Sequence, residues 1–321
     1  MSKNEIAFIT KTEKHMRSRT SVETIAKMWL YEKQPYIKPS SYARYNLIIR
    51  KYIVLPFGRD DISNFDGNFL SQYSRKLTES LKPKTVRDIL TVLKQIMAYA
   101  EESSLCSVDL SRIKYPKGGS AVVSVLTVFE QSQLQSYLTE NIDTQKLGVL
   151  ICLYTGLRLG EICALRWGDI DLNSGVIKIR RTVQRICKVS GGTEFLIDSP
   201  KSENSVRNIP LPDFLAEQLK NFRCDDMALY FLTGTSRFMQ PRTYQNRFKA
   251  YLRTAGLDES YHFHSLRHTF ASRAIELHFD PKTLSELLGH SSVGITLNRY
   301  VHSTIELKRK SMRLFDKQLQ G

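Results

Sequence analysis

A segment without apolar periodicity, residues 103–124, most constrains what this chain can fold into. It contains Tyr115-Pro116-Lys117-Gly118-Gly119-Ser120, in which the proline and the glycines favour neither helix nor strand. Residues 21–104 before it carry only helical patterns, whereas residues 125–303 mix helical patterns with β-branched runs. Such a break between two differently patterned parts is typical of an interdomain linker, and 321 residues are enough for two domains. We therefore expect two domains joined by residues 105–124.

The first part is expected to fold as an all-α bundle. Residues 84–100, which follow Pro83, carry the clearest pattern, because apolar side chains recur every three to four residues and basic side chains lie on the opposite face. Three further helices are predicted at residues 21–33, 40–54 and 66–77. The basic residues of the clearest helix are Lys84, Arg87 and Lys94. A single basic face is usually only solvated, but four short helices with such faces favour a bundle that contacts DNA.

The second part is expected to be an α+β domain, mainly helical with a small antiparallel sheet. Helical patterns cover residues 129–138 and 145–153 and most of the chain after Pro212. β-branched runs between turn signals predict strands at residues 175–186, 194–198 and 207–211. Residues 304–321 carry an amphipathic pattern that predicts a tail helix, and residues 1–20 are expected to be flexible.

The charge of the chain favours a polyanionic partner. There are 47 lysines and arginines against 32 aspartates and glutamates, a net charge of +15, which is typical of a protein that binds nucleic acid. The five cysteines include no C-x-x-C pair, which predicts reduced thiols rather than disulfides or a zinc ribbon. Residues 1–20 are polar and basic, unlike a secretory signal, and the longest apolar run is about half a membrane span. We expect a cytoplasmic protein with no membrane partner.

Six of the seven histidines lie between positions 262 and 302, which indicates a site. His264 and His268 have the four-residue spacing of a zinc-binding helix, but Ser265 stands where a zinc protease has glutamate, and no acidic or cysteine cluster supplies further ligands. A phosphate site is favoured instead. His264 and Arg267 lie three residues apart at the start of a predicted helix, where a guanidinium and backbone N–H groups can bind phosphate oxygens. We expect no metal and no cofactor.

Three other blocks carry chemistry at regular spacings. Thr155-Gly156-Leu157-Arg158 is followed by Glu161, Leu288-Gly289-His290 ends a predicted helix with a glycine cap, and Tyr300 lies ten residues after His290. Together with the His264-x-x-Arg267 block, they resemble the tyrosine recombinase (phage integrase) family. The resemblance runs through the whole second part, and the helices of the first part resemble the SAM-like core-binding domain of that family.

The resemblance implies that Arg158 and Arg267 bind the scissile phosphate and that Tyr300 is the nucleophile. These residue types suit the reaction, because an attacked phosphodiester gains negative charge and two arginines stay cationic at any working pH. A tyrosine is only about one thousandth phenolate at neutral pH, so the cationic site and a nearby base must help to remove its proton.

The resemblance also implies roles for four neighbours of these residues. His264 and His290 would be further hydrogen-bonding or acid–base groups, and Glu161 would orient the site. Lys201, in the variable segment before the predicted strand at 207–211, corresponds to the hairpin lysine that the family uses as general acid. The remaining histidines of the cluster are expected to be mainly structural: His262, His268, His278 and His302.

The function implied by the resemblance is site-specific recombination of double-stranded DNA through 3′-phosphotyrosyl links and a Holliday junction. A homotetramer would act on two attachment-type sites, the tail helix at 304–321 would contact a neighbouring protomer, and an accessory directionality factor could take part. Residues 40–58 resemble core-binding domains of phage and conjugative-element integrases, which favours integration and excision of a mobile element.

Other functions with related chemistry remain as alternatives. A Xer-type resolvase or a DNA invertase would use the same residues. The separate helical domain disfavours a type IB topoisomerase, and the complete set of expected catalytic residues disfavours a non-catalytic DNA-binding regulator.

Overall fold

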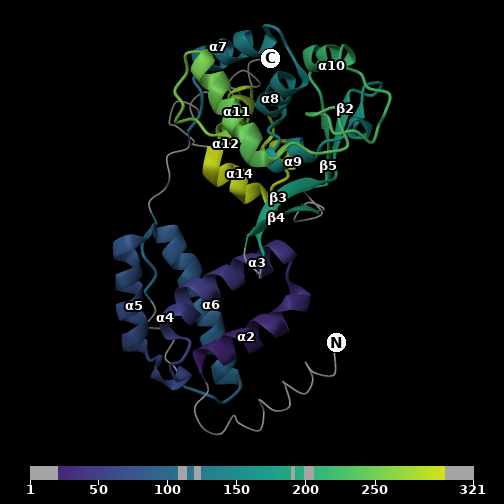
Figure 1. Ribbon diagram of the computed structural model, residues 1–321. Helices are drawn as coiled ribbons and strands as arrows, with labels where there is room; N and C mark the ends of the chain where they lie inside the picture. Colours follow the sequence, from purple (N-terminus) through teal and green to yellow (C-terminus); the bar gives the residue numbers. More distant parts are fainter. Residues whose placement is uncertain (1–20, 108–113, 119–123, 189–191, 199–205, 301–321) are drawn as a thin grey trace, which may run out of the picture. The chain divides into compact units, whose positions relative to one another are not determined.

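The computed structural model describes residues 21–107, 114–118, 124–188, 192–198 and 206–300 (Figure 1). The chain divides into two compact units. The first comprises Met1–Ala121 with Arg185–Glu194, and the second comprises Val122–Gln184 with Phe195–Gly321. The predicted tail helix lies outside the described residues. None of the described helices is long and apolar enough to cross a membrane.

The first unit contains the predicted all-α bundle, drawn in purple to blue in Figure 1. Its longer helices are α2 (Val22–Lys33), α3 (Pro39–Ile48), α5 (Gly67–Ser80) and α6 (Pro83–Glu102). A π-helical stretch (Ile49–Val54) and α4 (Leu55–Phe57) continue α3 beyond the predicted end. The starts follow from local chemistry: Ser21 and Asp66 accept hydrogen bonds from backbone N–H groups of the first turns of α2 and α5, and prolines begin α3 and α6.

Helix α6 supplies the largest part of the core of the first unit. Its apolar stripe is buried from Val86 to Ala100, whereas Lys84, Arg87 and Lys94 are exposed on the other face. Side chains from α2, α5 and the π-helical stretch complete this core. The structure therefore confirms the predicted helix and its basic face, while the predicted contact of that face with DNA stays a prediction.

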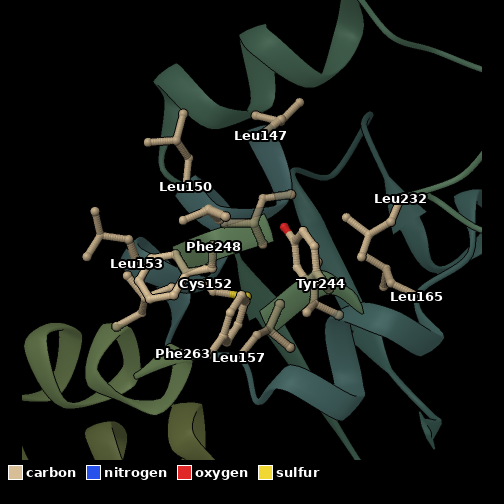
Figure 2. Close-up of a cluster of buried hydrophobic side chains, with 14 of the residues drawn as sticks. Leu147, Leu150, Cys152, Leu153, Leu157, Leu165, Leu232, Tyr244, Phe248 and Phe263 are labelled. Carbon is tan, nitrogen blue, oxygen red and sulfur yellow. The ribbon is translucent and has the colours of Figure 1, made fainter. Parts of the chain in front are cut away.

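The second unit is mainly helical, as the sequence predicted. Its helices are α7 (Val128–Thr139), α8 (Thr144–Thr155), α9 (Leu159–Ala164), α10 (Asp213–Lys220), α11 (Pro241–Thr254), α12 (Phe263–Glu276), α13 (Pro281–Leu288) and α14 (Val293–Tyr300). Figure 2 shows leucines of α8 gathered around Tyr244 and Phe248 of α11. Gly148 permits this close approach, since a Cβ there would lie 2.5 Å from the Tyr244 hydroxyl oxygen. That hydroxyl donates to the Gln145 carbonyl at 2.7 Å, which satisfies it inside the core.

Two small sheets replace the single sheet that the sequence predicted. The first has three antiparallel strands in the order β1 (Ile170–Asp171), β2 (Val176–Ile179) and β5 (Arg207–Pro210). The second pairs β3 (Thr182–Cys187) with β4 (Thr193–Asp198).

The predicted continuous strand at 175–186 is therefore wrong, because the chain leaves the first sheet after Ile179. At the break, Arg181 forms an ion pair with the nearly buried carboxylate of Asp169 at 2.5 Å. Beyond it, β3 runs so close to α9 that a Cβ at Gly160 would lie 2.6 Å from the Val183 carbonyl oxygen. These tertiary contacts, rather than a turn signal in the sequence, separate β2 from β3.

Candidate active site

The block that contains Arg158 forms the turn between α8 and α9. Gly156 ends α8 in the left-handed conformation (φ +68°), and Arg158 is the residue before the first turn of α9. One oxygen of Glu161 accepts from the Arg158 backbone N–H at 2.9 Å, and the other accepts from Nη1 of Arg158 at 2.8 Å. The local fold thus pairs this arginine with a carboxylate three residues later, and 35% of the arginine side chain stays exposed.

Arg207, on β5, binds the same carboxylate from the other side. Its Nη1 and Nη2 donate to the two oxygens of Glu161 at 3.0 and 2.8 Å, and its Nε donates to the Leu287 carbonyl at 2.7 Å. Only 6% of the Arg207 side chain and 2% of the Glu161 side chain are exposed. Burial alone would raise the pKa of Glu161, but the hydrogen bonds and charge of Arg207, together with Arg158, lower that pKa to about 2. The carboxylate is therefore ionised at neutral pH.

Arg267 lies on the buried face of α12 and is only 2% exposed. Its Nη1 donates to the Gly156 carbonyl at 2.8 Å. Burial, and next the charge of Arg158, lower the pKa of Arg267 to about 9, and Glu161 and Tyr300 act in the opposite direction. The guanidinium remains cationic at neutral pH, so the site holds a buried positive charge.

Two left-handed glycines anchor the two arginines of the predicted site. The Gly156 carbonyl accepts from Arg267, and the Gly289 carbonyl, at the end of α13 (φ +63°), accepts from Nη2 of Arg158 at 2.8 Å. A Cβ at Gly156 would lie 2.7 Å from Leu288, and one at Gly289 would lie 3.0 Å from Nη1 of Arg207. Both positions therefore need glycine for its backbone conformation and for its small size.

Tyr300 lies against α12, with its hydroxyl oxygen 2.5 Å from Nδ1 of His268. Both side chains are buried, and the tyrosine packs among Ala271, Leu284 and Leu288. The exposed His264 ring meets the His268 ring edge to face at 4.5 Å between ring centres. His268, expected to be structural, thus contacts the predicted nucleophile.

His290 directly follows the Gly289 anchor. Its Nδ1 lies 2.8 Å from the hydroxyl of Thr296, which is fully buried in α14. This contact joins the end of α13 to the helix that carries Tyr300. Lys201 lies outside the described residues, and Lys84, Arg87 and Lys94 belong to the first unit rather than to the unit that contains this site.

Two residues of the site, Arg207 and His268, were not predicted from the sequence. A signal for Arg207 was present, because residues alternate between the two faces of a strand and Ile209 faces the core. Arg207 shares that face, and a buried guanidinium needs a carboxylate partner. For His268 the sequence offered no comparable signal, because its contact with Tyr300 depends on how α14 returns to α12.

The arrangement suits the binding of an oxyanion. Two guanidinium groups, those of Arg158 and Arg207, bind one carboxylate, and the buried charge of Arg267 is close enough to be affected by both Arg158 and Glu161. The site therefore carries a net positive charge, and Arg158 is its partly exposed arginine. Such a site can stabilise the extra negative charge of an attacked phosphodiester. Within the described residues, no three His, Cys, Asp or Glu side chains form a group that could hold a metal ion.

Comparison with known protein families supports the resemblance found in the sequence. Residues 124–306 match the phage integrase family, and residues 21–66 match the N-terminal SAM-like domain of phage integrases. The first match covers more than half of the chain and includes all the described site residues.

Individual relatives and a solved structure agree with this match. A tyrosine recombinase XerC-like protein of Caldanaerobacter subterraneus subsp. tengcongensis is 27% identical over 85% of this chain and 77% of its own length. The ICEBs1 integrase of Bacillus subtilis is 26% identical over 90% of this chain and 81% of its own length. The Tn1549 transposon integrase, solved in complex with a circular intermediate DNA, has the same fold, with a TM-score of 0.73 and 21% identity over 92% of this chain and 100% of that chain.

Proposed function

The chain belongs to the phage integrase family, and we propose that it integrates and excises a mobile DNA element as a site-specific tyrosine recombinase. It is an enzyme that cleaves and religates DNA. The observation that carries the proposed chemistry is that Arg158, paired with Glu161, and Arg267, bound to the Gly156 carbonyl, are held on the elements packed around Tyr300. Similarity to the ICEBs1 integrase over most of the chain supports a mobile element as the substrate.

Arg158 and Arg267 bind the scissile phosphate in the proposed mechanism. Arg158 is the accessible donor, since a third of its side chain is exposed and its other contacts fix its direction. Arg267 is more deeply buried and adds a second positive charge to the site. Preformed donors of this kind need no rearrangement as negative charge develops on the phosphate.

Tyr300 is the proposed nucleophile. Its hydroxyl oxygen attacks the phosphorus, a 3′-phosphotyrosyl bond forms, and the bond to the 5′-oxygen breaks. His268 Nδ1 accepts the phenol proton as the attack proceeds. We assign the proton for the departing 5′-oxygen to Lys201, on the family resemblance alone. His264 and His290 complete the hydrogen bonds around the phosphate. Religation reverses these steps, with a 5′-hydroxyl of the partner strand as the attacking group.

The partner of the proposed reaction is double-stranded DNA that carries attachment-type sites, reached in the cytoplasm. A tetramer on two sites, assembled through the tail at 304–321, would exchange one pair of strands at a time through a Holliday junction. The net charge of +15 supports the DNA partner. A directionality factor would then decide between integration and excision.

A Xer-type resolvase is the second candidate, because the XerC-like relative is as similar to the chain as the integrase relative is. The two roles differ in the DNA that the enzyme recognises. Repeats that flank the gene would be substrates of an integrase, whereas a resolvase would act on a chromosomal site elsewhere.

The test uses nicked suicide duplexes made from the repeats that flank the gene. The protein should form a covalent adduct with these duplexes, and Tyr300→Phe should bind them without forming one. Tyr261→Phe is the matched control, since it also removes a hydroxyl with a hydrogen-bond partner, Glu130, but leaves the site intact. Equal adduct from Tyr300→Phe would exclude this nucleophile.

Excess EDTA should leave adduct formation unchanged, because arginines supply the positive charge that nucleases take from Mg²⁺. Loss of the adduct in EDTA with recovery in Mg²⁺ would contradict the mechanism.

A further inference from the structure

We propose that Arg207 is a positioning residue for the cleavage reaction: it neutralises the buried carboxylate of Glu161 and so keeps the charge of Arg158 available to the DNA phosphate. This inference rests on the proposed function. It gives a role to a residue that the sequence motifs did not single out.

The contacts of Arg207 point inward. Its Nε, Nη1 and Nη2 donate to the Leu287 carbonyl and to both oxygens of Glu161, and only 6% of the side chain is exposed. Arg158, in contrast, is 35% exposed. Arg207 therefore acts on the substrate through Arg158 rather than by touching the DNA.

The charges of Arg158, Glu161 and Arg207 indicate that Arg207 neutralises the Glu161 carboxylate. Glu161 carries one negative charge and touches two guanidinium groups. If Arg158 were the only partner of Glu161, the carboxylate would cancel the positive charge of Arg158 that binds the DNA phosphate. Because Arg207 binds both carboxylate oxygens, the group of three keeps one net positive charge, and Arg158 is the member that solvent can reach.

Arg207 also determines where Arg158 is held. Arg158 has two anchors besides its own backbone contact: the Glu161 carboxylate and the Gly289 carbonyl. Arg207 binds the first anchor directly, and through Leu287 and its packing beneath Gly289 it supports the second. Strand β5, helix α9 and the end of α13 meet at this one side chain.

The test compares Arg207→Met, Glu161→Gln and the double variant by the rate of adduct formation on the nicked flanking-repeat duplex. Arg207→Met should slow adduct formation by about 10- to 100-fold with little change in the Kd for the same duplex, as expected for loss of a supporting contact behind a catalytic group. Adding Glu161→Gln should restore much of the lost rate, because no negative charge remains to be neutralised. If Arg207 only fills space, the two losses should add, and a double variant slower than Arg207→Met would overturn the proposal.

Arg207→Lys separates charge from shape. It keeps the positive charge beside Glu161, so its cleavage rate should lie closer to the wild type than to Arg207→Met. A rate as low as that of Arg207→Met would also overturn the proposal. Arg207→Lys can be measured even if Arg207→Met folds poorly, because lysine keeps a positive charge beside the buried Glu161 carboxylate.

Arg181→Met is the matched control, because it removes a guanidinium from another nearly buried carboxylate, Asp169, outside the cluster around Arg158. It should lower the melting temperature without slowing cleavage by the folded protein. An adduct from the wild type with no effect of Arg207→Met would refute this inference alone. The absence of any adduct from the wild type would refute the proposed function instead.

Discussion

The hydroxyl of Tyr300 and Nδ1 of His268 lie 2.5 Å apart, and both side chains are more than nine-tenths buried. The predicted nucleophile is thus held inside its own domain rather than presented on the surface. In the proposed reaction the phenol passes its proton to this nitrogen while its oxygen attacks the DNA phosphate bound by Arg158.

Replacing His268 should therefore affect cleavage. His268→Phe keeps an aromatic ring in the same space but removes the nitrogen that contacts Tyr300, so adduct formation should slow by at least about 100-fold, the low end for loss of an acid–base partner. The control is His278→Asn, which tolerates the left-handed backbone found at that exposed position (φ +62°). Single-turnover rates on the nicked duplex measure both variants, and an unchanged rate for His268→Phe would show that its contact with Tyr300 has no part in the reaction.

The two phosphate-binding arginines should differ in what their loss does to stability. Arg158→Ala and Arg267→Ala should each slow cleavage by at least about 100-fold, the usual effect of removing one transition-state donor. Arg267→Ala should also lower the melting temperature clearly, because it empties a buried position and leaves the Gly156 carbonyl without its donor. Arg158→Ala should lower it less. Equal melting temperatures for the two variants would contradict the difference in burial.

The ionisation of Glu161 predicts a pH dependence of stability. Its pKa is about 2 in the folded protein and 4.5 as a reference, so the folded state favours the charged form. The stabilisation is fully present above pH 4.5 and is lost as the pH falls towards 2, with a total of about 3 kcal/mol.

Urea unfolding between pH 6 and pH 3 measures this effect. Glu161→Gln has no such group and should show a flatter acid limb than the wild type, although its stability at pH 6 is lower. Parallel acid limbs for the two proteins would argue against a strongly lowered pKa.

Gly289→Ala tests the anchor of Arg158 against a matched glycine. Gly289 and Gly175 both have φ +63°, but a Cβ at Gly289 would lie 3.0 Å from Arg207, whereas one at Gly175 meets nothing within 4 Å. Both alanine variants should lose about 1–2 kcal/mol of stability from the left-handed backbone. Only Gly289→Ala should also slow adduct formation, because it displaces the carbonyl that Arg158 binds. Equal cleavage by the two variants would show that this anchor is dispensable.

The basic face of α6 can be tested by the salt dependence of DNA binding. Each lysine or arginine that contacts a phosphate should contribute about 0.9 to the slope of log Kd against log salt. Replacing Lys84, Arg87 and Lys94 with glutamine should therefore lower the slope by up to about 3. Lys27→Gln on α2, where the lysine is paired with Glu23, is the control. An unchanged slope would mean that the face of α6 is only solvated.

The elements of the fold could largely be predicted because their signals are local. The stripe of α6, the caps at Ser21 and Asp66, and the glycine at the end of α13 depend only on neighbours in the chain. The break between β2 and β3 could not be predicted, because it depends on contacts with α9 and Asp169.

The candidate site likewise combines contacts between sequence neighbours, which could be predicted, with contacts between distant segments, which could not. The turn that pairs Arg158 with Glu161 is local, and its residues were identified because the block from Thr155 to Glu161 resembles a motif of the family. The second partner of Glu161 comes from β5, 46 residues away, and the partner of Tyr300 comes from α12, 32 residues away. A single sequence shows which side chains require partners, but only the folded chain shows which partners they find.

The acceptors that hold Arg158 and Arg267 at Gly289 and Gly156 are main-chain atoms, and this affects how the enzyme can be engineered. An amino-acid substitution cannot remove a main-chain carbonyl. Mutant libraries designed for a new DNA target can therefore vary exposed residues outside the site, provided that Gly156 and Gly289 are kept. Active variants selected for a new DNA target should accordingly retain glycine at positions 156 and 289.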